Sequence, residues 1–254
     1  SISVESASEK VLEAMKKPVD LEWSEDAIKI CHEIKMPITV NFITGMPYET
    51  KEDMMKTFRW AEKVGADWST FSVLVPYPGT EIFEYSKKQG YLDPDSLDLE
   101  GLTQRNPTIE TEKWTREWVA DQTYHYNVLI NFIKNYNLIE KDGNLAFVTG
   151  FLENIVMHHP RHLIGKICLA YAYHRVGNSK GANELLAKSK LLLDDPEVLE
   201  TYGSYLDLNE QVMNFFRDAL IEGLPDRTPE GELVAVSGGT LGSIDFYGEN
   251  VPSE

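Results

Sequence analysis

The chain has 254 residues, 42% of them hydrophobic and 26% charged, as in a globular protein with one large core or two smaller ones. Its net charge of −17 disfavours nucleic acid as a partner, because proteins that neutralise phosphates present a basic face. No apolar stretch is long enough to cross a bilayer, and no charged-then-apolar signal opens the chain. We therefore expect a cytoplasmic protein without a membrane span.

Residues 1–92 alternate between apolar runs and amphipathic helical patterns. The patterns predict strands at 1–5, 38–43 and 71–75, and helices at 8–17, 24–34, 51–64 and 81–88. Ser24 is the expected cap of the second helix, Thr50 and Asp53 form a capping box for the third, and Gly65 ends it. The run 38–43 is apolar throughout, which is typical of a strand buried on both faces of a parallel sheet. Strands joined through helices imply right-handed crossovers, and three such units make a partial barrel or a piece of an open sheet.

From about residue 112 long helical patterns replace the strands. One long helix is predicted around 114–132 and another at 145–157. The segment 169–196, LAYAYHRVGNSKGANELLAKSKLLLDDP, resembles one tetratricopeptide repeat in which Ala170 faces Ala182 where two helices cross, and an ordinary helical cap is the alternative. The predicted domains are an α/β part at 1–105, a helical part at 106–217 and an irregular tail at 218–254.

The end of each predicted strand carries residues suited to a ligand site. Glu5, the segment 44–49 and the segment 76–80 fall at the carboxyl edge of a parallel sheet, where such folds bind ligands. Gly45 follows an apolar strand directly, so a flat ligand can approach the backbone there. Glu49 can accept hydrogen bonds from backbone N–H groups and hold the loop. Each feature is common by itself, and their joint order predicts the site.

Three segments in register resemble the radical S-adenosylmethionine (SAM) superfamily. SVESASEKVLEAMKKP (3–18) resembles its fourth-strand region, and NFITGMPYETKEDMMKTFRWA (41–61) resembles its fifth-strand motif GxIxGxxE with the continuation PxET. FSVLVPYPGTEIFEYSKKQGYL (71–92) resembles its sixth strand and a PxPGT turn. That turn is typical of the subgroup with an N-terminal cobalamin-binding domain, which includes anaerobic porphyrin cyclases and many methyltransferases. The resemblance implies an α/β part, the C-terminal half of a partial TIM-type (βα) barrel, followed by an all-α domain.

The resemblance also implies which residues approach SAM. They are Glu5, Ser6, Ile43, Gly45, Glu49, Val73 and Val75. Ile43 would pack against adenine, Gly45 would let the chain approach, and Glu49 would shape the loop beneath. The backbone from Val73 to Val75 would lie near the adenine edge, and Glu5 or Ser6 would face the ribose or methionyl group of SAM. Asn41 and Ala7 depart from the family's pattern, which has glycine at both positions.

The cluster-binding motif CxxxCxxC of this family does not occur in the sequence. Cys31 and Cys168 cannot replace the three thiolates that hold a [4Fe–4S] cluster, so no catalytic residue and no metal ligand is assigned. We expect the chain to be the C-terminal half of a longer radical SAM oxidoreductase or methyltransferase. SAM, the cluster and, in the subgroup, cobalamin would belong to that parent, which would bind a small-molecule substrate. The chain by itself would be inactive and bind none of these cofactors tightly.

Two other readings of the sequence stay open. The chain could be a non-catalytic scaffold whose tetratricopeptide-like helical half binds a protein partner, or an unrelated α/β-barrel enzyme with Glu5 and Glu49 as acid and base. The joint presence of PxET and PxPGT favours the radical SAM reading. The group HHPRH at 158–162 has metal-binding side chains, but Pro160 interrupts their helical spacing, so a cluster at a helix end is expected.

Overall fold

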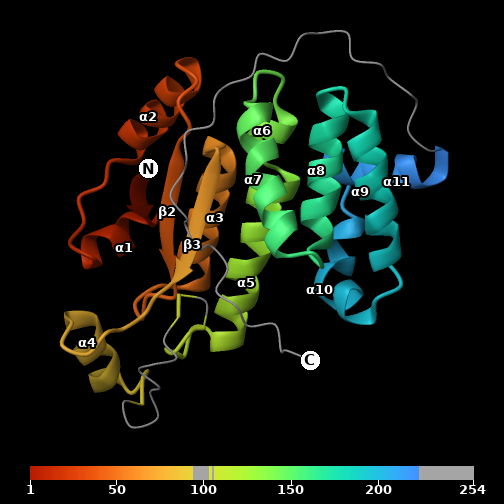
Figure 1. Ribbon diagram of the computed structural model, residues 1–254. Coiled ribbons are helices and arrows are strands. Elements are labelled where there is room, and N and C mark those ends of the chain that lie inside the picture. The colour runs from red at the N-terminus through yellow and green to blue at the C-terminus, as the bar shows by residue number, and fades with distance from the viewer. Residues whose placement is uncertain (94–102, 105, 223–254) are drawn as a thin grey trace.

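The structure is a computed structural model that describes residues 1–93, 103–104 and 106–222. An α/β part lies at the left of Figure 1, helices α8 to α11 lie at the right, and α5 to α7 lie between them. The elements in chain order are β1 (Ile2–Glu5), α1 (Glu9–Ala14), α2 (Leu21–Glu33), β2 (Thr39–Thr44), α3 (Lys51–Val64), β3 (Trp68–Val73), α4 (Glu81–Gln89), α5 (Arg116–Val128), the π-helix η1 (Leu129–Ile133), α6 (Tyr136–Ile139), α7 (Leu145–His158), α8 (Leu163–Arg175), α9 (Ser179–Leu192), α10 (Pro196–Leu206) and α11 (Gln211–Glu222).

The three strands form a parallel sheet in the order β1-β2-β3, which confirms the predicted parallel alternation. β2 and β3 pair in continuous register from Thr39 opposite Trp68 to Thr44 opposite Val73. The pairing of β1 with β2 shifts near Glu5. Because the strands are parallel, their carboxyl ends share one edge of the sheet.

Only one face of β2 is fully buried, so the expectation of burial on both faces is wrong. Side chains alternate along the strand between buried, such as Phe42, and half-buried, such as Asn41 and Ile43. The buried face packs on α1, α2 and α3: Phe42 stacks on Phe71 at 5.0 Å, and Phe71 meets Phe58 of α3 at 5.3 Å. The half-buried face has no comparable aromatic layer among the described residues, because its side chains are mostly polar.

Several element ends follow the predicted signals, and others lie elsewhere. The Thr50–Asp53 capping box is present, and Gly65 ends α3 at a φ of +60°. The second helix begins earlier than predicted, because Asp20 rather than Ser24 caps it, accepting from the N–H groups of Glu22 at 2.9 Å and its neighbour at 3.1 Å. β3 likewise begins at residue 68 instead of 71, because its pairing with β2 starts at Trp68 opposite Thr39.

The helical half differs from its prediction at both ends. The helix predicted around 114–132 starts at Arg116 and widens into the π-helix η1 over its last turn. Residues predicted to be tail at 218–222 belong to α11, since the helix continues to Glu222, and the rest of the predicted tail, 223–254, lies outside the described residues. The domain limits at 105 and 217 stay a prediction.

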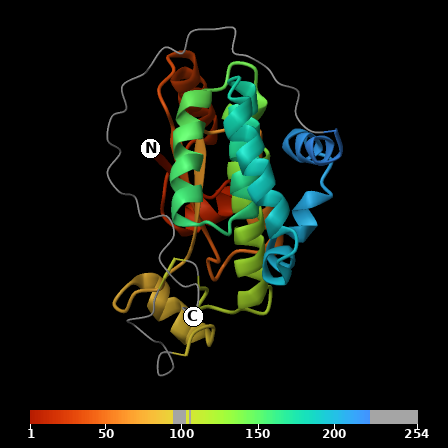
Figure 2. The ribbon, with the colours of Figure 1, turned by 45° about the vertical axis from the view of Figure 1, so that its right-hand side comes forward.

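Helices α8 and α9 pack against each other as the predicted hairpin. Helix α7 lies beside α8, as Figure 2 shows. Ala170 and Ala182 are both fully buried. Gly181 leaves room for a close contact between the two helices, because a Cβ built there would lie 2.7 Å from the ring of Tyr173 and 2.7 Å from Asn178 Nδ2. A true tetratricopeptide repeat stays a prediction.

Side-chain amides from the helical half bond to the outer edge of β3. Asn131 in η1 bonds to the backbone of Ser69, and Asn135 donates to the carbonyl of Asp67 at 3.0 Å. These bonds fix the helical half against the sheet.

Candidate functional site

The loop after β2 is organised around the side chain of Glu49. Its Oε2 accepts a hydrogen bond from the N–H of Met46 at 2.8 Å, and its backbone carbonyl accepts from Trp114 Nε1 at 3.1 Å. Glu49 is fully buried, and this burial raises the pKa of its carboxyl to about 8 although the N–H groups of Met46 and Gly45 favour the ionised form. The Oε1 atom has no hydrogen-bond partner in the described chain. Glu49 therefore acts on the loop and cannot reach a substrate as an acid or base.

Glu5 gives the loop after β1 its direction. Its φ of +66° lies in the left-handed region, which non-glycine residues seldom adopt and which often marks functional sites. The Glu5 carboxylate forms an ion pair with Lys17 and keeps 14% of its side-chain area exposed. The turn directs Ser6 into the interior, where its hydroxyl bonds to Thr57 at 3.1 Å and to the N–H of Ser8 at 3.1 Å. Of the two residues predicted to face SAM after this strand, only Glu5 has an accessible side chain.

Two residues of α3 tie the loop after β1 to the loop after β2. Thr57 Oγ1 accepts from the N–H of Ala7 at 3.0 Å. Asp53 accepts from the Ser8 hydroxyl at 2.7 Å and from the N–H of Thr50 at 2.9 Å. Burial opposes the ionised form of Asp53, but the bonds from Thr50, Ser8 and Lys10 outweigh it and lower the pKa to about 2. Sequence reasoning found Asp53 only as a cap and did not find Thr57, since no local pattern marks a contact fifty residues away.

The chain after β3 joins the same edge. The N–H of Leu74 donates to the carbonyl of Thr44 at 2.8 Å, so the ends of β2 and β3 stay together beyond the sheet. Val73 is buried, and its N–H donates to the carbonyl of Gln104 at 2.7 Å. Val75 is half-buried, and no hydrogen bond joins its backbone to another described residue. Its peptide groups are thus suited to bind the edge of a planar ligand.

Gly45 is packed by the protein interior on the side where a Cβ would stand. It adopts a φ of +82°, and a Cβ there would meet Val119 at 3.3 Å and Val73 at 3.7 Å. The space left by the missing side chain is therefore filled by the protein interior. The glycine is needed for its backbone conformation and for the close packing of α5, while Ile43, two residues earlier, lies half-buried on the face of the sheet that carries Asn41.

The seven residues predicted to approach SAM thus all lie at or next to the carboxyl edge of the sheet, but in different environments. Ile43, Val75 and the side chain of Glu5 are partly exposed. The other four, Ser6, Gly45, Glu49 and Val73, are buried and build the loops. Whether any of them binds SAM stays a prediction.

The two cysteines do not fit an iron–sulfur cluster. Cys31 lies in the hydrophobic cluster of the α/β part and Cys168 in that of the helical part, and both are buried. Burial also raises the pKa of the Cys168 thiol, which disfavours the thiolate that a metal needs. Within residues 1–93, 103–104 and 106–222, no group of three or more His, Cys, Asp or Glu side chains could hold a metal ion.

The HHPRH group lies at a helix start, as expected. His162 caps α8: its Nδ1 accepts from the N–H of Gly165 at 2.9 Å, and its ring stacks on Phe132 at 4.7 Å. Burial lowers the pKa of His162 to about 3, with a smaller contribution from His159. His158 lies at the end of α7, where its Nδ1 bonds to the carbonyl of Asn154 at 2.9 Å.

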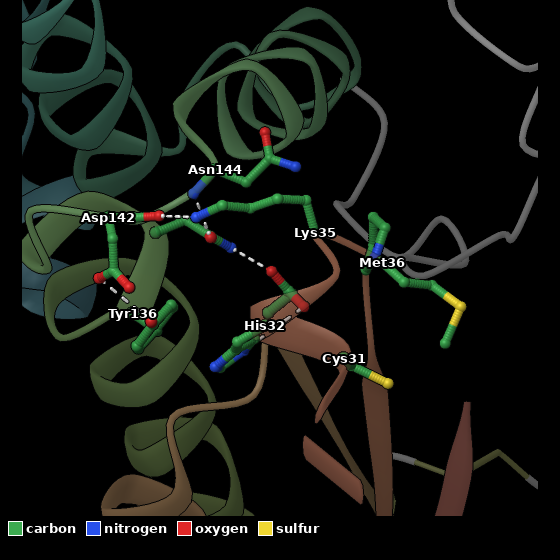
Figure 3. A pocket seen from close by; sticks show the side chains of 10 residues that line it. Cys31, His32, Lys35, Met36, Tyr136, Asp142 and Asn144 are labelled. Carbon is green, nitrogen blue, oxygen red and sulfur yellow. Dashed lines mark hydrogen bonds and ion pairs between the residues drawn. The ribbon is translucent and has the colours of Figure 1, made fainter. Parts of the chain in front are cut away.

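A pocket at the opposite, amino edge of the sheet is shown in Figure 3. There the buried carboxylate of Asp67 accepts from the N–H of Ile38 at 2.7 Å and from Asn137 Nδ2 at 2.8 Å. His32 stacks on Tyr136 at 4.0 Å, and its Nε2 lies 3.8 Å from Asp67 Oδ2. Most of these polar groups bind one another, so the pocket joins α2 to α6 rather than presenting a ligand site.

Comparison with known proteins shows which family the α/β part resembles. Residues 1–61 match the Radical SAM superfamily. Similar proteins include an uncharacterized methyltransferase of Pyrococcus horikoshii (30% identity), the cytidylyl-2-hydroxyethylphosphonate methyltransferase of Streptomyces wedmorensis (29%) and the tRNA-2-methylthio-N(6)-dimethylallyladenosine synthase of Buchnera aphidicola (27%). These matches cover 46%, 50% and 56% of this chain and 25%, 25% and 32% of the relatives. The chain thus spans about a quarter to a third of the length of the curated relatives it matches. In the described part, no helix has the length and apolar character that a membrane span requires.

Proposed function

We propose, from the premise that the chain belongs to the radical SAM superfamily, that the carboxyl edge of its sheet holds the adenosine part of SAM in a methyltransferase-type enzyme. The observation that carries the proposal is the connection between the loops. Asp53 and Thr57 on one helix bind the loop after β1, and Glu49 holds the loop after β2. Groups fixed in this way cost little entropy when a ligand binds.

Each exposed group has its own part in the proposal. Ile43 contacts the adenine face, because it is the half-buried apolar side chain nearest the end of β2. The N–H and carbonyl of Val75, which bond to no other described residue, bond to the adenine edge. Glu5, whose carboxylate is held by Lys17, faces the ribose or the methionyl group. When bound, SAM supplies a sulfonium centre whose one-electron cleavage starts radical chemistry.

The described residues do not supply the electron for that cleavage, since their cysteines do not fit a [4Fe–4S] cluster. We assign to this chain the binding and orientation of SAM and no redox step. The PYPGT turn at 76–80 supports cobalamin use by the whole protein, and a small molecule as its substrate is part of the same proposal. With only one side of the pocket described, we expect affinity for SAM in the millimolar range, since each net hydrogen bond contributes about 1 kcal/mol.

Saturation-transfer difference NMR with SAM tests the proposal, because it detects weak binding and shows which ligand protons touch the protein. We expect the adenine protons to receive the strongest signal. Ile43→Lys should abolish it, because the added charge replaces the apolar contact. Thr39→Lys is the matched control, since Thr39 is half-buried on the same face of the same strand at its amino end. Equal signals in both variants would rule out this site.

A second pair of variants tests the support of the loops. Thr57→Val removes the hydroxyl that accepts from Ala7 and bonds to Ser6, while Thr57→Ser keeps it. We expect Thr57→Val to lose most of the adenine signal and Thr57→Ser to retain it. A signal unchanged in Thr57→Val would show that the loop after β1 does not contribute to binding.

A further inference from the structure

His32 has a buried ring nitrogen that faces a buried carboxylate. The residue lies in the last turn of α2, and its Nε2 has no hydrogen-bond partner in the described part of the chain. Asp67 Oδ2 lies 3.8 Å from this nitrogen, beyond hydrogen-bond distance, and the Asp67 side chain is 4% exposed. A neutral ring with its proton on Nδ1 would leave two acceptors, the nitrogen and the carboxylate, opposite each other without a proton between them.

The surroundings of His32 favour a positive charge on its ring. Asp67 supplies the opposite charge, and its carboxylate is held by the N–H of Ile38 at 2.7 Å and by Asn137 Nδ2 at 2.8 Å. Tyr136 stacks on the imidazole at 4.0 Å with the ring planes 13° apart, so its aromatic face can attract a cation. The carbonyl end of a helix also favours a cation, and the imidazole lies at that end of α2.

The other titratable groups around the imidazole are neutral or bound to other partners. Lys35, which follows α2, donates from Nζ to the carbonyl of Asp142 at 2.8 Å, and the Asp142 carboxylate accepts from the Tyr136 hydroxyl at 3.2 Å. Glu140 acts on that hydroxyl from the end of α6, and the thiol of Cys31 lines the pocket from α2. Among the described residues that line the pocket, Lys35 is the only other basic side chain, and its ammonium group is directed at a carbonyl.

We propose that His32 and Asp67 form a pH-sensitive joint between the α/β part and the helical half. Imidazole changes its charge between about pH 5 and 8, and a proton taken up on Nε2 makes the ring a cationic donor to the carboxylate. The pocket has about 10 Å³ of free space, so the two groups can close the remaining distance (Figure 3). Because Asp67 also binds Asn137 and the imidazole stacks on Tyr136, the ion pair draws α2 and α6 together. At higher pH the neutral ring makes no such bond, and the joint loosens.

The joint is distinct from the other bonds that attach the helical half. Asn131 and Asn135 bind the backbone along β3, and amides do not titrate in this pH range, so these bonds stay the same. The attachment that responds to pH is therefore the one through α6 and the loop that follows it. It lies at the amino edge of the sheet, opposite the proposed SAM site, and does not depend on that proposal.

A double-mutant cycle measured at two pH values tests the proposal. His32→Phe keeps an aromatic ring beside Tyr136 but cannot take up a proton, and Asp67→Asn keeps an acceptor for the N–H of Ile38 but has no charge. In urea unfolding at pH 5.5 each variant should lower the midpoint, and the double variant should lower it by less than the sum, because both variants remove the same pair. At pH 8 the two shifts should add. His32→Gln is the second variant of this position and should give the same pattern.

Two control cycles use matched substitutions. His158→Phe with Asp67→Asn should give additive shifts at both pH values, because His158 is exposed at the end of α7. His32→Phe with Asp142→Asn should also give additive shifts, because the Asp142 carboxylate binds the tyrosine hydroxyl instead of the imidazole. Additive shifts for His32 and Asp67 at pH 5.5, or the same non-additivity at both pH values, would overturn the proposal. Non-additivity with Asp142 in place of Asp67 would overturn it as well.

Hydrogen–deuterium exchange tests whether the pair tightens the attachment of the helical half. After correction for the intrinsic exchange rate, we expect the amides of residues 136–144 to be at least about threefold better protected at pH 5.5 than at pH 8. In His32→Phe the protection should be equal at the two pH values, and the amides of α9 should show no difference in either protein. Equal protection of residues 136–144 in the wild type at both pH values would contradict the joint.

Discussion

The side-chain amide of Asn131 pairs with both backbone groups of Ser69. Its Oδ1 accepts from the Ser69 N–H at 2.7 Å, and its Nδ2 donates to the Ser69 carbonyl at 2.7 Å. A neighbouring strand would make the same two bonds, so Asn131 completes the outer edge of β3 without a further strand. Asn131 lies in the π-helix η1 and is almost fully buried. Its two bonds to Ser69 explain why a polar amide side chain occupies this core position.

Replacing Asn131 should therefore destabilise the protein more than its size suggests. Asn131→Leu leaves the N–H and carbonyl of Ser69 buried without partners, and we expect a loss of about 2–4 kcal/mol in the free energy of unfolding. Urea denaturation measures it. Asn183→Leu on the exposed surface of α9 is the control and should change stability by less than about 0.5 kcal/mol. Similar losses of unfolding free energy in both variants would show that the bonds between Asn131 and Ser69 contribute little to stability.

Glu49 should make the protein less stable as the pH rises. Its pKa is about 8 in the fold against 4.5 for an unperturbed carboxyl, so between these values the unfolded chain has lost a proton that the folded chain keeps. Stability then falls with rising pH, by at most about 1.4 kcal/mol per pH unit. Glu49→Gln keeps the acceptor for the Met46 N–H and cannot ionise, so its stability should lack this decline.

Urea unfolding of the wild type and Glu49→Gln across this pH range measures the difference. Glu184→Gln, an exposed change of the same kind, should keep the wild-type dependence. Parallel curves for the wild type and Glu49→Gln would mean that Glu49 is ionised throughout and that its hydrogen bonds outweigh its burial.

His162 should make the protein less stable as the pH falls into the acidic range. Its folded pKa of about 3 lies below its ordinary value of 6.5, so its contribution is complete above 6.5 and is lost as the pH falls towards 3. His162→Asn keeps a side chain that can cap α8 but loses the ring that stacks on Phe132. We expect the variant to be about 1–2 kcal/mol less stable at neutral pH, with the difference narrowing as the pH falls. Thermal unfolding in acidic buffers measures this, and a constant difference would contradict it.

Two helical glycines should respond oppositely to alanine. In Gly181→Ala the new Cβ would lie 2.7 Å from the ring of Tyr173, which must move, so we expect a loss of about 1–3 kcal/mol. Gly203 in α10 has nothing within 4 Å of a Cβ, and Gly203→Ala should raise stability by about 0.5–1 kcal/mol through helix propensity. Differential scanning calorimetry compares the two. Equal shifts of the melting temperature in the two variants would show that α8 and α9 do not cross closely at Gly181.

The sequence determined the parallel βα alternation and the site edge through signals that act over a few residues. The Thr50–Asp53 capping box and the helix end at Gly65 appear where their patterns predict them, because these bonds close within one helical turn. The parallel order follows from the alternation itself, since a strand, a helix and a second strand connect in one way. The motif from Asn41 to Glu49 likewise marked the loop and its buried carboxylate.

Only the tertiary structure decided which groups in those loops are used internally. Ser6 turns inward because Thr57, fifty-one positions away, bonds to its hydroxyl. Gly45 is packed on its Cβ side by Val119 from the helical half, a contact that no pattern around Gly45 predicts. Asn131 meets Ser69 across sixty-two positions. Such contacts depend on how separate elements pack, and no pattern within one element contains them.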